Sequence, residues 1–267
     1  TIVDKDGDPS TSTLTVYVED TSPIIAKVDE DELPGGITDG DAITTVATGN
    51  LAELAVGPSA GVQFGLSGNT AGLAPATSGG VGLVYSVSGD TLTAKAGVAG
   101  PTVFTLQVLT NGDYTFTLSK PLDHPLGNGD DNELLVMNFA SLLQATDGGN
   151  PVALAGQFLV QIEDDVPAAS TNPAVQLDDD ALSGGIAGGP AGTDDANSVN
   201  VTGTLSHNFG ADGAGTVQWL TSGAPGGFSY QSGPGGSLLV KQGTTTILTL
   251  TLNTATGAYT VTQNNPI

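Results

Sequence analysis

The chain has 267 residues, lacks cysteine, and carries 28 acidic against 5 basic residues, for a net charge of −23. This charge argues against nucleic acid and anionic membrane surfaces as partners, because binding them requires a basic surface. The absence of cysteine excludes disulfides and thiolate metal sites, so we expect calcium to be the stabilising cofactor of so acidic a chain. The sequence contains no apolar run of about eighteen residues that would span a bilayer, so we expect no membrane insertion.

Short segments that alternate or enrich β-branched and aromatic residues follow one another along the chain and predict β-strands. Turn dipeptides such as Asn111-Gly112 separate them. Only residues 50–56 and 138–144 favour a turn or two of helix. The sequence therefore predicts an all-β fold of tandem immunoglobulin- or cadherin-like antiparallel β-sandwich modules. The predicted strands are 13–18, 82–87, 102–109, 114–118, 157–162, 238–241, 246–252 and 258–263.

Internal repetition divides the chain. Residues 28–37, with four acidic residues before Gly-Gly-Ile, recur at 177–186, where there are three, and residues 111–117 recur at 256–262. The segment 15–23 recurs at 159–167. We therefore expect the closing strand of a preceding unit at 1–23, a complete β-sandwich unit at 24–167 and a truncated second unit at 168–267.

Carboxylates gather where one predicted unit gives way to the next. Ca²⁺ takes six to eight oxygen ligands at about 2.3–2.6 Å, and carboxylates this dense repel one another without a cation. The alternative is a solvated acidic linker that adds only solubility, but the arrangement occurs at both junctions and this favours metal sites between neighbouring units. The predicted ligands are Glu19, Asp20, Asp29 and Asp31 at the first junction and Glu163, Asp164, Asp165, Asp178 and Asp180 at the second.

Two loops resemble fragments of known calcium loops. Asp4, Asp6 and Asp8 alternate as at the start of an EF-hand loop, which makes them further candidate ligands. Pro9 stands where that loop needs glycine, so a plain solvated loop is an equal alternative. Residues 127–131 resemble one turn of an RTX nonapeptide, but no stacked copies follow.

Catalysis has little support in the sequence. His124 stands between Asp123 and Pro125, where we expect it to cap or hydrogen-bond a turn. The sequence contains no nucleophile elbow, His-Glu metal motif or phosphate loop, so we do not expect an enzyme. Paired carboxylates leave a glycosidase open by residue type alone. Trp219 is either a sugar-stacking platform or a core residue, and its repeat counterpart Phe64 favours the core.

The motifs together resemble a known family. Residues 114–125 read Tyr-Thr-Phe-Thr-Leu-Ser-Lys-Pro-Leu-Asp-His-Pro, and they lie between the acidic motif at 29–31 and those at 131–134 and 162–167. This order resembles the long repeat domain of type I secreted RTX-type giant bacterial adhesins, over nearly the whole chain. The resemblance implies calcium-stiffened extender modules outside the cell, which hold ligand-binding domains away from the bacterial surface in biofilm formation or attachment.

The resemblance also implies partners. They are neighbouring modules of the same adhesin and ligand-binding domains inserted after Ile267, although a cut within a longer chain explains that stop equally well. We expect a monomer, with head-to-tail exchange of strand 13–18 into the truncated unit of a neighbouring molecule as an alternative. A lectin-like module that binds a glycan or peptide is the second hypothesis for function, and a polysaccharide-acting enzyme is the third.

Overall fold

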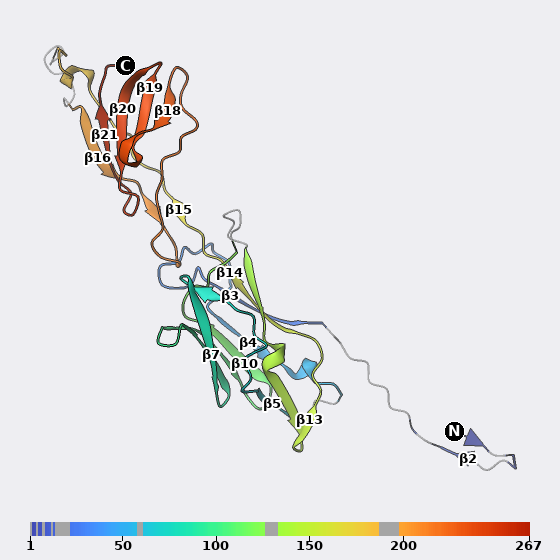
Figure 1. The fold of residues 1–267 in the computed structure, drawn as a ribbon. Coiled ribbons are helices and arrows are strands. Elements are labelled where there is room, and N and C mark those ends of the chain that lie inside the picture. The colour runs from blue at the N-terminus through green and yellow to red at the C-terminus, as the bar shows by residue number, and fades with distance from the viewer. Residues whose placement is uncertain are drawn as a thin grey trace. The chain divides into compact units, whose positions relative to one another are not determined.

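The computed structural model divides the chain into two compact units, unit 1 (Thr1–Val166) and unit 2 (Pro167–Ile267). It describes residues 2–3, 5–6, 9–11, 13, 22–57, 61–125, 133–186 and 198–267. In these ranges every regular element is a β-strand or a single 3₁₀ turn (Figure 1). The prediction of an all-β, largely antiparallel sandwich fold is confirmed.

The larger sheet of unit 1 is antiparallel and has the strand order β4-β10-β9-β8-β7-β6. Alternation puts Phe104, Leu106 and Phe116 on its buried face, while threonines point to the opposite face. The predicted strands at 82–87, 102–109 and 114–118 are all present. The strands are β4 (Val46–Asn50), β6 (Thr77–Ser78), β7 (Val81–Ser88), β8 (Thr91–Ala96), β9 (Thr102–Val108) and β10 (Asp113–Leu118).

Two three-stranded sheets, with orders β11-β14-β3 and β13-β12-β5, lie in unit 1 beside the larger sheet. The ring of Phe158 lies 4.7 Å from that of Tyr114, and the ring of Phe139 lies 6.0 Å from that of Phe116. These aromatic contacts form the core between the layers. The strands are β3 (Ile24–Asp29), β5 (Val62–Leu66), β11 (Leu134–Asn138), β12 (Leu143–Asp147), β13 (Asn150–Val152) and β14 (Phe158–Glu163), and the 3₁₀ turns are η1 (Ala52–Leu54) and η2 (Ala140–Leu142).

One strand pair in unit 1 runs parallel. β14 pairs with β3 in the register Phe158↔Ile24 to Glu163↔Asp29. Because the two strands point the same way, their carboxyl ends leave the sheet at the same edge. Both strands end in acidic residues, so this pairing decides where the carboxylates meet.

The main sheet of unit 2 repeats five of the six strands in the larger sheet of unit 1, and β6 has no counterpart among the described residues of unit 2. The sheet of unit 2 is antiparallel with the order β16-β21-β20-β19-β18. Tyr259 pairs with Gly203 as Tyr114 pairs with Gly49, and in both units the tyrosine ring occupies the space that a glycine Cβ would need. The strands are β16 (Asn200–Thr204), β18 (Ser229–Ser232), β19 (Leu238–Gln242), β20 (Thr245–Leu252) and β21 (Ala258–Gln263).

Smaller elements complete the described residues. The pair β15 (Ala168–Ala169) and β17 (His207–Asn208) and the 3₁₀ turns η3 (Asp179–Ala181) and η4 (Pro234–Gly236) belong to unit 2. Trp219 packs edge-on against Tyr259, with ring centroids 6.5 Å apart, but it is only half-buried, whereas its repeat counterpart Phe64 is 5% exposed. β1 (Ile2–Val3) and β2 (Pro9–Ser10) form an antiparallel pair, and the predicted strand at 13–18 lies outside the described residues except for Thr13.

The aromatic core predicts a large cost for truncating Phe158. Phe158→Ala removes a fully buried ring and its contact with Tyr114, so we expect the free energy of unfolding of unit 1 to fall by about 3–5 kcal/mol. Val81→Ala, at an exposed position in β7, is the control and should change it by less than about 0.5 kcal/mol. Urea denaturation measures both, and equal midpoints for the two variants would contradict this packing.

Candidate metal centre

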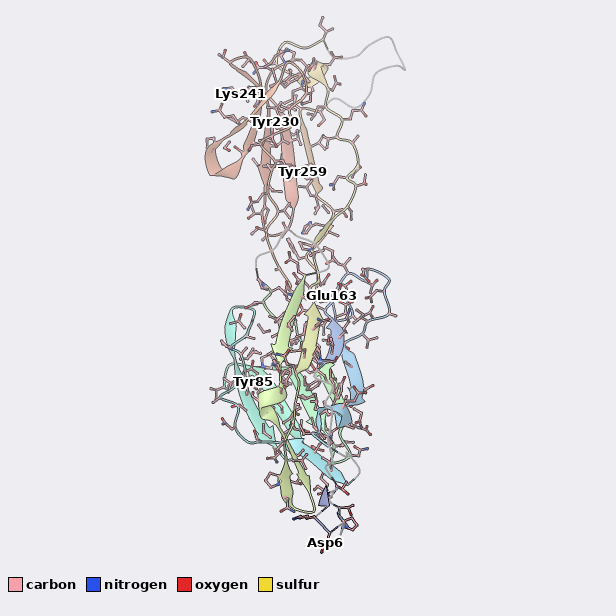
Figure 2. All side chains as sticks on the ribbon, turned by 90° about the vertical axis from the view of Figure 1, so that its right-hand side faces the viewer. Asp6, Tyr85, Glu163, Tyr230, Lys241 and Tyr259 are labelled. Atoms are coloured by element: carbon pink, nitrogen blue, oxygen red, sulfur yellow. The ribbon has the colours of Figure 1, made fainter. Side chains whose placement is uncertain are left out.

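Two acidic segments meet at one edge of unit 1. Asp29 ends β3 opposite Glu163 at the end of β14, and the backbone N–H of Glu30 donates to the Glu163 carbonyl at 3.2 Å. Figure 2 labels Glu163 at this edge. The residues that follow each strand therefore lie side by side, which places loop 29–31 next to segment 163–165.

Four carboxylates at this edge are almost completely buried. The exposed fractions are 2% for Asp29, 0% for Glu30, 3% for Asp31 and 2% for Asp165. Backbone N–H groups supply part of their hydrogen bonding: that of Asp31 donates to Asp29 Oδ1 at 2.9 Å and that of Ile37 donates to Asp165 Oδ1 at 3.2 Å. Such neutral donors stabilise a carboxylate but leave the net negative charge in place.

The first group of possible ligands consists of Asp29, Asp39 and Asp41. One carboxylate oxygen from each lies within 4.8 Å of the others. The N–H of Asp41 donates to Asp39 Oδ1 at 2.8 Å and that of Ile43 donates to Asp41 Oδ1 at 2.7 Å, so backbone turns orient these side chains. A cation about 2.3–2.6 Å from each oxygen fits this spacing, and an all-oxygen set with two exposed members suits Ca²⁺ with bound water.

The second group consists of Glu30, His124 and Asp164, which also bring one ligand atom each within 4.8 Å of the others. His124 Nε2 lies 3.4 Å from Glu30 Oε1, and the two side chains are 3% and 0% exposed. The N–H of Leu122 donates to the same Glu30 oxygen at 2.8 Å. The expectation that His124 serves a turn was incomplete, since its ring lies against a buried glutamate. A nitrogen donor is poorly suited to Ca²⁺, so we interpret this group as a contact between a histidine ring and two carboxyl groups beside the first group, and not as a calcium site.

Burial opposes the ionisation of this edge. It raises the pKa of Asp29 to about 6, and the carboxylates of Asp41, Glu163 and Asp39 add to the rise, against the hydrogen bond from the N–H of Asp31. Burial also raises the pKa of Asp164, although His124 offsets part of the effect. A bound cation would reverse this balance, because it favours the charged carboxylates.

Unit 2 contains the same acidic loop. The N–H of Asp180 donates to Asp178 Oδ1 at 2.9 Å, as Asp31 does to Asp29, and the N–H of Asp178 donates to the Ser198 carbonyl as Asp29 does to that of Thr44. The burial differs, because Asp178 and Asp180 are only half-buried and Asp179 is exposed. In the described part of unit 2, no strand stands where β14 stands in unit 1.

The structure regroups the residues that the sequence singled out. Glu163, Asp164 and Asp165 lie beside Asp29 and Asp31 within unit 1, a partnership that grouping by position along the chain did not include. Asp6 is exposed, and the other predicted ligands at the start of the chain, Asp4, Asp8, Glu19 and Asp20, lie outside the described residues.

The predicted ligand set lacked four members of the two groups: Asp39, Asp41, His124 and Glu30, the last of which stands among the carboxylates of the first junction. A signal existed for two of them, since Asp39-Gly40-Asp41 carries acidic residues at alternate positions shortly after the loop. No local signal linked His124 to Glu30, because the two are far apart in the chain.

Comparisons of this chain with protein-family models, with curated proteins and with solved structures found no match. Among the described residues, the structure has no helix with the length and apolar character needed to cross a membrane.

The raised pKa of Asp29 predicts an unusual pH dependence for the metal-free chain. Between about pH 4 and pH 6, Asp29 is protonated in the folded state but ionised in the unfolded state, where its pKa is 3.8. The free energy of unfolding should therefore fall as the pH rises through this window. Asp29→Asn should remove that decline and be the more stable form above pH 6. Asp178→Asn, at the equivalent position in unit 2, is the matched control.

Calorimetric melting of calcium-stripped protein at several pH values between 4 and 7 measures this difference. If the melting temperatures of wild type and Asp29→Asn stay parallel across the window, Asp29 is not held in the buried, charge-crowded setting described above.

Proposed function

We propose that this chain is a calcium-stiffened extender segment of an extracellular bacterial adhesin. In this role unit 1 acts as a spacer that holds ligand-binding domains away from the cell. One observation carries the proposal, namely four carboxylates no more than 3% exposed at one edge of the sandwich.

The balance of charge at this edge favours a bound cation. Burying an unbalanced carboxylate costs several kcal/mol, and a single imidazolium at His124 balances at most one of the four. A divalent ion bound by Asp29, Asp39 and Asp41 would compensate more of this charge and use the oxygen ligands that Ca²⁺ prefers. The exposed members of that group leave the ion open to exchange with the medium.

The setting fits an extracellular spacer. Extracellular modules bind Ca²⁺ with Kd of about 10⁻⁴–10⁻³ M, so the same chain would be loaded outside a cell and empty in the cytosol. The repeated loop and sheet in the two units support a tandem array, in which each unit contributes length. With no cysteine for disulfides, bound cations are the remaining cross-links for such an array.

Calcium should stabilise unit 1 through its exposed ligands. At about 100 times Kd, a single site adds about 2.7 kcal/mol, which corresponds to a rise in Tm of several degrees for a domain of this size. Asp41→Asn should abolish most of that rise, because it removes a charged ligand while its Oδ1 still accepts from Ile43. Glu53→Gln, an exposed acidic position in η1, is the control for loss of one charge.

Scanning calorimetry with and without 5 mM CaCl₂, a concentration of about 5 to 50 times the Kd expected for such modules, gives the readout. A calcium response equal in wild type, Asp41→Asn and Glu53→Gln would sink the assignment of the site. No response in any of them would sink the proposed function.

A further inference from the structure

We propose that Glu30, His124 and Asp164 of unit 1 bind a zinc ion at a site separate from the candidate calcium ligands Asp29, Asp39 and Asp41. The ion cross-links three segments that are far apart in the chain, namely loop 29–31, loop 121–124 and the end of β14. The proposal goes beyond the proposed function and rests on different ligands.

The donor chemistry of this group suits a transition metal ion. One ligand atom from each of the three residues lies within 4.8 Å of the others. An imidazole nitrogen together with carboxylate oxygens is a set that Zn²⁺ accepts, whereas Ca²⁺ prefers oxygen ligands alone. The two neighbouring groups therefore differ in the ion that each selects.

The spacing of two of the donors fits a tetrahedral ion. His124 Nε2 lies 3.4 Å from Glu30 Oε1, which is beyond the usual N–H···O hydrogen-bond distance of about 2.7–3.2 Å. Ligand atoms about 2.0–2.2 Å from a tetrahedral zinc ion lie about 3.3–3.6 Å from one another. The observed separation is thus that of two ligands of one ion, with the imidazole neutral and its proton on Nδ1.

Burial makes such an ion favourable here. The side chains of His124 and Glu30 are 3% and 0% exposed. Asp164 Oδ1 is also buried, and it accepts no hydrogen bond from any residue that the structure describes. A buried carboxylate oxygen in this state is costly unless another partner satisfies it. A zinc ion supplies that partner and brings two positive charges, whereas a protonated His124 brings one.

Hydrogen bonds to the larger sheet hold the residue that precedes His124. Asp123 Oδ2 accepts from the N–H of Gly80 at 2.8 Å, and the N–H of Asp123 donates to the Thr77 carbonyl at 2.8 Å. The loop that carries the imidazole is therefore fixed at the β6-β7 turn. A ligand held in advance loses less conformational freedom when the ion binds.

The two carboxylates are held in a similar way. The N–H of the fully buried Leu122 donates to Glu30 Oε1 at 2.8 Å, which orients the carboxylate and leaves it able to bind an ion as well. The N–H of Asp164 donates to the Glu133 carbonyl at 3.0 Å. The fourth position of a tetrahedral shell is left to water or to the Glu133 carboxylate.

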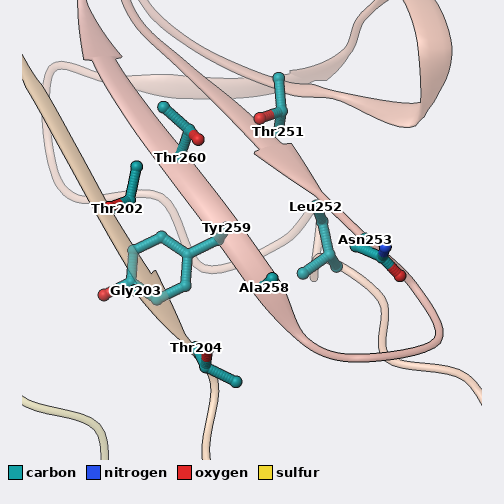
Figure 3. A pocket seen from close by; sticks show the side chains of 9 residues that line it. All are labelled: Thr202, Gly203, Thr204, Thr251, Leu252, Asn253, Ala258, Tyr259 and Thr260. Carbon is teal, nitrogen blue, oxygen red and sulfur yellow. The ribbon is translucent and has the colours of Figure 1, made fainter.

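The described part of unit 2 offers no second group of this kind. The hollow beside Tyr259 is lined by threonines, a glycine, an asparagine and apolar residues, without a histidine or a carboxylate (Figure 3). His207, the other of the chain's two histidines, donates from Nδ1 to the Leu205 carbonyl at 2.7 Å and packs against Phe209. We therefore expect one zinc ion per chain, and His207 provides a matched control.

The experiment is a calorimetric titration of the metal-stripped full chain with ZnCl₂, in millimolar CaCl₂ so that calcium fills its own group. Wild type and His207→Gln should bind one Zn²⁺ per chain with equal affinity. His124→Gln and Asp164→Asn should each bind it about 100-fold more weakly or worse, because each loses a ligand. Glu53→Gln is the control for the lost charge of Asp164→Asn. A cooperative urea transition shows that a variant is folded, and Asp164→Asn, at the more exposed position, keeps the test valid should His124→Gln not fold.

A second readout reports the geometry of the bound ion. Co²⁺ takes the place of Zn²⁺ in tetrahedral sites and then absorbs visible light strongly, whereas six-coordinate Co²⁺ absorbs weakly. Wild type and His207→Gln should show the strong absorption and lose it when ZnCl₂ is added. His124→Gln should show only the weak absorption.

Four outcomes overturn the proposal. They are a wild type that binds no Zn²⁺, equal affinity in wild type and His124→Gln, zinc binding that millimolar CaCl₂ abolishes, and a six-coordinate cobalt spectrum in wild type. The second places the ion on other carboxylates, and the third places it in the calcium group. Zinc binding by a chain whose Tm does not respond to calcium contradicts the proposed function alone, and a calcium response without zinc binding contradicts the zinc site alone.

Discussion

The parallel pairing of β14 with β3 is the constraint on which the candidate site depends. In an antiparallel pair the two acidic strand ends would leave the sheet at opposite edges. In the parallel register, Glu163 lies opposite Asp29, and the residues that follow both strands are forced together. The aromatic core holds that register, since Phe158 at the start of β14 packs on Tyr114 of the other layer. Hydrophobic burial thus stabilises an electrostatic arrangement that is unfavourable by itself, and a divalent ion is the simplest way to make it favourable.

Comparison of the two copies of the acidic loop distinguishes features that the loop's own residues determine from features that depend on distant strands. Both loops have the same hydrogen bond from the third acidic residue to the first, and both bring a glycine so close to a carbonyl oxygen that a Cβ would lie 2.1 Å from it at Gly36 and 2.3 Å at Gly185. The conformation of the loop is therefore encoded within about ten residues. The burial of its charge differs between the units: β14 lies beside the loop in unit 1, and no strand of the described part of unit 2 lies there. The loop therefore adopts its conformation without β14, but the buried acidic site forms only where β14 lies beside the loop.

This division explains how far the sequence could be interpreted. Alternation and turn dipeptides predicted strands such as β9, β10 and β20, because those signals are local. Acidic repeats identified Asp29, Asp31 and Asp165, yet the partnership between the first two and the third follows from a parallel pairing of distant strands that periodicity does not encode. Asp39 and Asp41 were missed because the chain returns to the site after the glycine turn. His124 was missed because its turn context gave an adequate local explanation, whereas its position against Glu30 depends on the packing of the whole sandwich.

The central claim is that the buried edge of unit 1 holds a divalent cation. A crystal structure of the chain grown in millimolar CaCl₂ tests it most directly, with the anomalous signal of the ion as the identifying feature. The account predicts an ion about 2.3–2.6 Å from carboxylate oxygens of Asp29, Asp39 and Asp41, with water completing the shell. If calcium-rich crystals show clear density for these three side chains with only water or a positively charged side chain between them, the central claim is contradicted.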